Sequence, residues 1–179
     1  MRSILTVLIL TALAGTMAFA EMKVVTQTYD IPAVACDGLN LEGVGYVFTI
    51  GPAPSADCTA GTLAGPGVTN HISRPNIEGS ASGVLHLTFF VPTTKFSFGV
   101  AQSTTSLTQE VIINLNRPGV GLLRESITLI TTADPIFVGA RYEYDGPAVK
   151  TVTISFSNIG GRFAIDNVTY FRPPGQDKK

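Results

Sequence analysis

The chain has 179 residues, 45% of them hydrophobic and 14% charged, and its formal net charge is −1 at pH 7. This length suits one domain, and the balanced charge gives no basic footprint for nucleic acid or for an anionic membrane surface. We therefore expect no nucleic-acid partner.

Residues 1–20 have the pattern of a secretory signal peptide. Arg2 precedes the apolar run "ILTVLILTALAG", which is short for a membrane span, and Ala18-Phe19-Ala20 matches an A-x-A cleavage pattern. The alternative is an uncleaved anchor helix. We predict cleavage before Glu21, a secreted, extracellular protein and no membrane attachment after cleavage.

After the leader, hydrophobicity alternates with a period of two, which is typical of half-buried strands. The segments with this pattern are 22–29, 42–50, 83–91, 95–102, 109–116, 125–132, 137–146, 148–157 and 162–171. Gly, Pro, Asn or Asp punctuates the connections, and a short turn after Pro92 is expected to separate the third strand from the fourth. The sequence thus predicts one all-β domain over 21–171, an antiparallel, jelly-roll-like β-sandwich of eight to nine strands, with a flexible tail at 172–179.

Residues that share one parity within these strands make up the predicted core. They are Leu85, Leu87, Phe89, Phe96, Phe98, Ile113, Leu115, Val152, Ile154, Phe156, Phe163 and Ile165.

Residues 51–82 do not follow the alternation and are rich in Gly, Pro, Ala, Ser and Asn. They predict either a surface loop, with a short strand near 68–72, or a loop that covers one end or face of the sandwich and carries a site. Two cysteines, Cys36 and Cys58, are present in the part that remains after cleavage. In an exported chain they most simply pair with each other, and the disulfide would hold this loop.

The last predicted strand changes phase near its middle. Phe163 and Ile165 share one parity, whereas Val168 and Tyr170 have the other. A strand can switch parity on one face only if a residue is inserted, as in a β-bulge. Asp166-Asn167 occupies the switch, so we predict a bulge there, with the Asp166 carboxylate accepting from backbone donors that the bulge leaves unpaired.

The same residues begin the only stretch that reads as an N-glycosylation sequon, Asn167-Val168-Thr169. A glycan on Asn167 is therefore a further prediction. A position inside a paired final strand would be poorly reachable after folding, so occupancy stays open.

Most of residues 55–171 falls in three stretches: "AGTLAGPGVTNHISRPNIEGSASGVLHLTFFVPTTKFSFGVAQST", "NRPGVGLLRESITL" and "ARYEYDGPAVKTVTISFS…GRFAIDNVTYF". Together they resemble a group of small secreted fungal proteins, which implies secretion and a β-sandwich and supplies no activity. The ending "FAIDNVTYF" is similar to the closing strand of bacterial exported jelly-roll ectodomains and carbohydrate-binding modules. That likeness implies a glycan-binding or surface role by fold analogy alone.

The second resemblance also implies a structural calcium ion, held in such modules by an acid of the last strand together with an early loop. Here the acid would be Asp166, and the early oxygens would come from Asp30, Asp37, Asn40 and Glu42. Calcium takes six to eight oxygen ligands, several of them carboxylates. Calcium binding is therefore the alternative to the bulge as an explanation for the acid at Asp166, and calcium is the cofactor that this alternative predicts.

Ligand contacts could come from two places in the sequence. Tyr142 and Tyr144 share a face and could stack on sugar rings, although that face could equally be core. His71 and Arg74, in the long loop, could form a polar site or lie solvated.

No G-x-S-x-G, H-E-x-x-H or phosphate-loop motif is present in the sequence, so we predict that the chain is not an enzyme. The predicted function is a secreted, non-catalytic binding module, with a glycan or cell-wall polysaccharide as partner. The alternatives are a structural or protein-interaction component of the cell surface, which binds a cell-surface protein, and a hydrolase.

Overall fold

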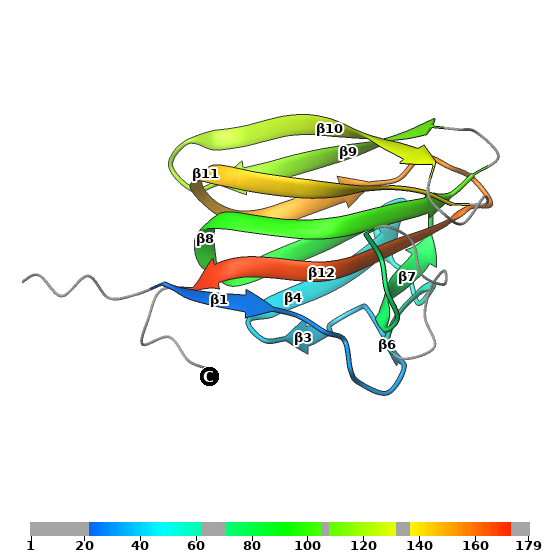
Figure 1. The fold of residues 1–179 in the computed structure, drawn as a ribbon, viewed down its shortest axis with the longest axis horizontal. Helices are drawn as coiled ribbons and strands as arrows, with labels where there is room; N and C mark the ends of the chain where they lie inside the picture. The colour runs from blue at the N-terminus through cyan, green and yellow to red at the C-terminus, as the bar shows by residue number, and fades with distance from the viewer. Residues whose placement is uncertain (1–21, 62–70, 105–107, 132–136, 173–179) are drawn as a thin grey trace, which may run out of the picture.

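The computed structural model describes residues 22–61, 71–104, 108–131 and 137–172, which form an all-β fold (Figure 1). The strands are β1 (Lys23–Thr26), β2 (Val34–Ala35), β3 (Asn40–Leu41), β4 (Val44–Ile50), β5 (Ala53–Pro54), β6 (Cys58–Gly61), β7 (Asn76–Ser80), β8 (Val84–Ser103), β9 (Thr108–Arg117), β10 (Gly121–Thr131), β11 (Phe137–Ser155) and β12 (Arg162–Arg172). Within these ranges no helix is long and apolar enough to cross a membrane. The predicted signal peptide lies outside the described residues.

The strands form one antiparallel sheet that folds over on itself into two layers, because the long strands β8 and β11 bend and take part in both. We call the layer that faces the viewer in Figure 1 the front sheet. It contains β1, β12, β7, β6 and β2, with the second half of β8 and the first half of β11. The back sheet contains β3, β4, β5, β9 and β10, with the other halves of β8 and β11. The predicted antiparallel sandwich is thereby confirmed.

The bends explain why the predicted strand boundaries are wrong in two places. The segments 83–91 and 95–102 form the single strand β8, and 137–146 and 148–157 form most of β11. Pro92 does not interrupt β8, because the ladder between β8 and β11 shifts register near this residue and Pro92 is not one of its paired positions. A proline that has no N–H to give is tolerated where the chain makes no ladder hydrogen bond.

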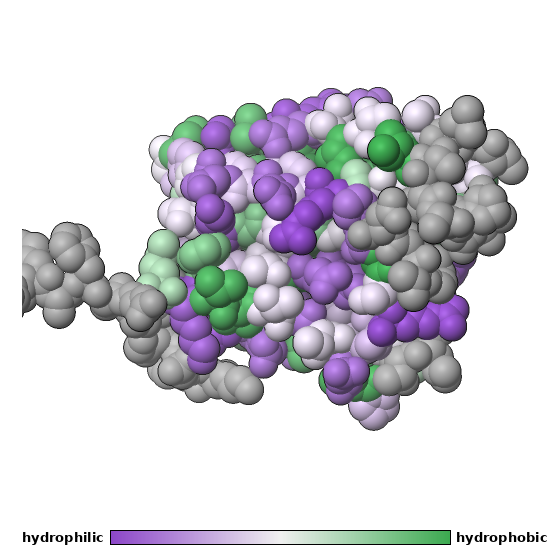
Figure 2. Space-filling model, viewed as in Figure 1, coloured by the Kyte–Doolittle hydropathy of each residue, from purple (hydrophilic) through white to green (hydrophobic). Residues whose placement is uncertain are grey.

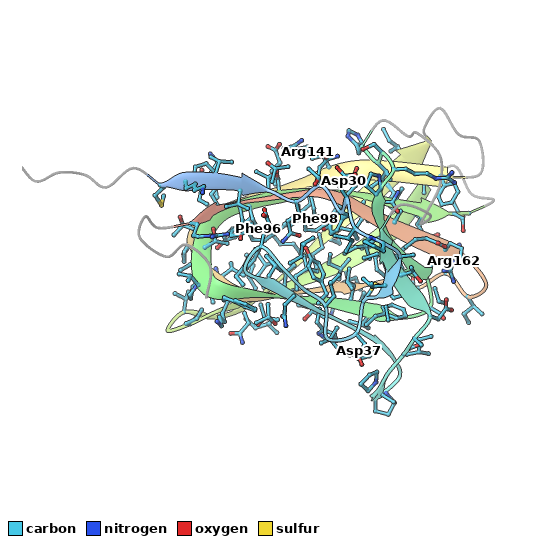
Figure 3. All side chains as sticks on the ribbon, turned by 90° about the horizontal axis from the view of Figure 1, so that it is seen from below. Asp30, Asp37, Phe96, Phe98, Arg141 and Arg162 are labelled. Carbon is cyan, nitrogen blue, oxygen red and sulfur yellow. A yellow bond between two sulfur atoms is a disulfide. The ribbon has the colours of Figure 1, made fainter. Side chains whose placement is uncertain are left out.

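The core lies between the two layers, as the side chains of Phe96 and Phe98 show in Figure 3. All twelve residues of the predicted core are buried, none of them exposing more than 6% of its surface. The rings of Phe156 and Phe163, one from each end of the β11–β12 connection, stack at a centroid distance of 4.2 Å. The period-two pattern therefore identified the inward faces correctly.

The predicted disulfide is confirmed, since Cys36 and Cys58 are bonded and their Cα atoms lie 5.4 Å apart. It joins the start of β6 to the turn that follows β2. The region 51–82 contains β5, β6 and β7, while 62–70 lies outside the described residues. At the other end of the domain, Arg172 belongs to β12 and is buried, so the predicted tail begins one residue too early.

Candidate functional site

The phase change in the last strand is a β-bulge. Asp166 pairs with Gly99 of β8 and Thr169 with Ser97, so three steps along β12 match two along β8. Asn167 takes the extra place, with a positive φ of 53°. Both Ile165 and Val168 are consequently buried, as the bulge prediction required.

Asp166 lies inside the polar network of the domain and exposes only 2% of its surface. Its Oδ1 accepts from the Asn167 backbone N–H at 2.6 Å, and its Oδ2 accepts from the Ser73 N–H at 2.8 Å. The Ser73 hydroxyl, at 2.7 Å, and the Asn167 Nδ2, at 2.9 Å, also donate to Oδ2. The carboxylate thus accepts a hydrogen bond from the backbone N–H of the bulge residue Asn167, and it also holds the segment around Ser73, 93 residues away in the sequence.

That segment, residues 71–75, covers part of the outer side of the front sheet. The backbone of His71 lies against Gly99 so closely that a Cβ on Gly99 would not fit. Ile72 packs with Ala101, Phe137 and Ala164 in a small buried cluster on this side. The predicted covering loop is therefore present in its described part. Contact of His71 or Arg74 with a ligand stays a prediction.

The four acidic residues of the predicted calcium set do not come together as a metal-binding group. Among the described residues, no group of three or more His, Cys, Asp or Glu side chains could hold a metal ion. Asp30 and Asp37 lie well apart in Figure 3. Glu42 lies in the turn before β4, where its carbonyl oxygen accepts from Tyr170 and Arg172. Asp166 meets hydrogen-bond donors instead of further carboxylates.

The remaining outer side of the front sheet carries charged side chains that form ion pairs with one another. Lys95 Nζ lies 3.1 Å from Asp145, and Arg141 Nε lies 2.8 Å from Glu143. Arg141 also donates to the Ser97 hydroxyl at 3.0 Å. Figure 2 shows hydrophilic residues across the middle of this face, and Arg141 projects away from the core in Figure 3. Its charged groups largely compensate one another.

The predicted sugar-stacking role of Tyr142 and Tyr144 is wrong, because both rings belong to the core. They expose 7% and 8% of their surface and pack against Phe96 at centroid distances of 5.8 and 5.3 Å. The Tyr142 hydroxyl donates to the carboxylate of Glu125. Burial, helped by this hydrogen bond, raises the pKa of Tyr142. Neither ring has a face available to a ligand.

The outer side of the back sheet carries a different surface, which we call the platform. Its residues are Asn40, Gly45, His86, Thr88, Phe90, Asn114, Asn116, Leu122, Arg124, Lys150, Thr151 and Thr153. The cross-strand register aligns Asn40, Gly45, Thr88, Thr151, Asn116 and Leu122 in one row over β3, β4, β8, β11, β9 and β10. With neighbouring strands about 4.8 Å apart, the row from Asn40 to Asn116 spans about 19 Å.

The four polar side chains of this row are accessible and form no side-chain hydrogen bonds within the described part of the chain. Asn40 and Asn116 are exposed and Thr88 and Thr151 half-buried. Two amides and two hydroxyls are thus available along one line for hydrogen bonds with a ligand.

An exposed aromatic ring lies beside the row. Phe90 exposes 51% of its surface, more than any other aromatic ring among the described residues. A Cβ on Gly45 would meet Asn40 Oδ1 at 3.0 Å and Phe90 Cε1 at 3.6 Å, so the amide and the ring converge over this glycine. Lys150 Nζ donates to the Phe90 backbone carbonyl at 2.9 Å, which brings an ammonium group to the backbone of this residue.

A second row runs parallel to the first, one register step away. It contains His86, Thr153, Asn114 and Arg124 in neighbouring strands. The imidazole of His86 lies between two hydroxyls, with Nδ1 3.3 Å from Thr153 Oγ1 and Nε2 3.5 Å from Thr49 Oγ1. Partial burial lowers the pKa of His86, so its ring is neutral near pH 7.

One signal in the sequence could have found Phe90. In "GVLHLTFFV" the inward parity of Leu85, Leu87 and Phe89 leaves Phe90 on the outward face with His86 and Thr88. No comparable signal marks Asn40 or Asn116, because their alignment depends on the pairing of five strands.

No protein-family model matches the sequence, and no curated protein matches it. Solved structures with a similar fold include a family 29 carbohydrate-binding module, at 10% identity and a TM-score of 0.48, over 84% of this chain and 89% of that one. The modules CBM22-1 and GH10 of Clostridium thermocellum endo-1,4-beta-D-xylanase 10B, complexed with xylohexaose, match at 15% identity and a TM-score of 0.39, over 86% and 29%. The K1 cleaved adhesin domain of Lys-gingipain from Porphyromonas gingivalis matches at 16% identity and a TM-score of 0.45, over 86% and 99%.

Carbohydrate-binding modules and a bacterial adhesin domain are thus among the structural neighbours, in line with the likeness of the closing strand. The likeness to fungal secreted proteins stays a prediction. At these identities and TM-scores none of the neighbours carries an argument about the ligand or the site of this chain.

Proposed function

We propose that the chain is a non-catalytic binding module that takes a glycan on the platform of the back sheet. The observation that supports this most directly is the row of four accessible polar side chains, Asn40, Thr88, Thr151 and Asn116, beside the exposed ring of Phe90. An extracellular location is part of the proposal, and the disulfide supports it because such bonds persist in oxidising compartments.

The chemistry of this row suits a sugar. Each pyranose presents hydroxyl groups around its rim, which both donate and accept, and a less polar face formed by C–H groups. Amides and hydroxyls can satisfy the rim, while an aromatic ring covers the apolar face. A row of about 19 Å is long enough to lie under a short oligosaccharide placed across the strands.

The front sheet is a weaker candidate for the same role. Residues 71–75 already cover part of its outer side, and its exposed charges are paired as Lys95–Asp145 and Arg141–Glu143. A ligand there would have to replace existing contacts, whereas one on the platform meets groups without partners.

Retention on insoluble chitin, glucan and cellulose tests the proposal, followed by affinity measurements with the soluble oligosaccharide of whichever polymer binds. Phe90→Ala should weaken binding about fivefold, because one ring–sugar stacking contact is worth about 1 kcal/mol. Val24→Ala is the matched control, since Val24 exposes 53% of its surface on β1 of the front sheet. Equal retention of the two variants would overturn the assignment of the platform.

A protein-interaction role at the cell surface is the second candidate. It is favoured by the exposed apolar tip of the β9–β10 hairpin, where Val120 and Leu122 expose 58% and 69%. Failure of the protein to bind all three polymers and their oligosaccharides, with intact folding, would favour this candidate over the first.

A further inference from the structure

The outward-facing residues of the platform include cations and no acid. The stretches that form it are 40–41 of β3, 43–49 of β4 and its turn, 84–90 of β8, 150–155 of β11, 112–116 of β9 and 122–126 of β10; the exposed acid Glu110 is on the same face of β9, two residues beyond them. Among their outward-facing side chains are Arg124 and Lys150, and no Asp or Glu. Glu125 is in these stretches, but it points inward to Tyr142. The whole chain, by contrast, has 13 acidic and 12 basic residues.

The two cations also lack acidic partners, unlike those of the front sheet. In the part of the chain that the structure describes, Arg124 makes neither an ion pair nor a side-chain hydrogen bond. Lys150 uses one of its three N–H donors on the carbonyl of Phe90. On the front sheet Lys95 and Arg141 each have a carboxylate within 3.1 Å. Among the described residues, neither cation of the platform is therefore paired with a carboxylate.

From these observations we infer that the ligand of the platform is an acidic glycan, one that carries carboxylate or sulfate groups. This inference rests on the proposed function and names its ligand class. Arg124 would bind such a group through two parallel N–H donors, as a planar guanidinium does with a carboxylate or sulfate. Asn114, its cross-strand neighbour, would donate from the same face.

The positions of the two cations fit a chain that lies across the strands. Arg124 is on β10 in the second row and Lys150 is on β11 beyond the first row, so they are separated by two strand spacings, about 10 Å, across the sheet and by about 10 Å along the strands. Lys150 is hydrogen-bonded to the backbone of Phe90 and would hold an acidic group of a sugar that stacks on the Phe90 ring. Two acidic residues of one oligosaccharide can thus be held at once.

The inference is tested by titrating the full chain with three soluble oligosaccharide classes: a polyuronate, a sulfated glucan and the unsubstituted glucan. Wild type should bind one of the acidic classes at least about tenfold more tightly than the neutral one, with affinity falling as salt is added. Arg124→Gln and Lys150→Gln should each lose about tenfold toward the acidic ligand and distinctly less toward the neutral one. Arg141→Gln, on the front sheet, is the matched control and should bind as wild type does.

The outcomes separate the inference from the proposed function. Preference for the polyuronate identifies carboxylate, and preference for the sulfated glucan identifies sulfate. Equal binding of neutral and acidic ligands, weakened by Phe90→Ala and unaffected by Arg124→Gln, overturns the acidic class and leaves glycan binding in place. No binding of the folded wild-type protein to any of the three overturns the acidic class, and a further failure to be retained on chitin and cellulose overturns glycan binding as well.

Discussion

Replacing Asp166 with alanine should destabilise the domain by about 2 kcal/mol. The carboxylate accepts four hydrogen bonds, two of them from the backbone N–H groups of Ser73 and Asn167. The side-chain donors can turn to water, and Asn167 is itself exposed. The part-buried Ser73 N–H loses its charged acceptor, and a hydrogen bond to a charged group is worth about 1.5–3 kcal/mol. Loosening of the Ile72 cluster adds to the loss.

Urea unfolding of wild type and Asp166→Ala measures this difference directly. For a domain of this size, 2 kcal/mol corresponds to a fall in melting temperature of about 4–8 °C. Asp166→Asn keeps one acceptor oxygen and should lose about half as much. Asp145→Ala is the control, because the exposed ion pair of Asp145 with Lys95 should contribute less than about 0.5 kcal/mol.

A loss below about 0.5 kcal/mol for Asp166→Ala, with an unchanged dependence on urea concentration, would refute the reasoning. It would mean that water enters the site and that the bulge needs no carboxylate. Chelator provides an independent check on the calcium hypothesis. Because the described residues hold no group of three metal-binding side chains, we expect chelator to leave the melting temperature of wild type unchanged.

Other side chains allow predictions of the same kind. Phe156→Ala should cost about 3–5 kcal/mol in urea unfolding, since it removes a stacked, buried ring; a loss under about 1 kcal/mol would contradict this. Gln102→Leu should stabilise by about 1 kcal/mol or more, because both amide atoms of Gln102 are buried and have no partner among the described residues; a lower melting temperature would show that the amide is hydrated. Reducing the Cys36–Cys58 bond, which closes a sequence separation of 22, should cost about 3 kcal/mol. The folded pKa of His86 is lowered, so the neutral ring contributes fully to the free energy of unfolding above the unfolded pKa of about 6.5, and this contribution is lost as the pH falls through the folded pKa. His86→Gln should therefore weaken the dependence of the free energy of unfolding on pH below about 6.5.

The sequence by itself determined the features that depend on neighbours along one strand. Alternation places Leu85, Leu87 and Phe89 on one face whatever their strand pairs with, because successive side chains of a strand point to opposite sides. The bulge at Asp166 follows in the same way, since two inward pairs of opposite parity require one inserted residue. The pairing of two cysteines needed only their number.

Tertiary structure decided which of the two faces of each strand meets another layer and which strands lie side by side. Tyr142 and Tyr144 share a parity that suits either a core or a sugar-binding surface. Their burial is decided by tertiary packing, which places Phe96 against both rings. The row from Asn40 to Asn116 exists because β3, β4, β8, β11 and β9 pair in one particular register. A shift of a single residue in any of these ladders would turn that strand's outward side chains inward. Register is set by long-range pairing and core packing, so no local pattern could have assembled the platform.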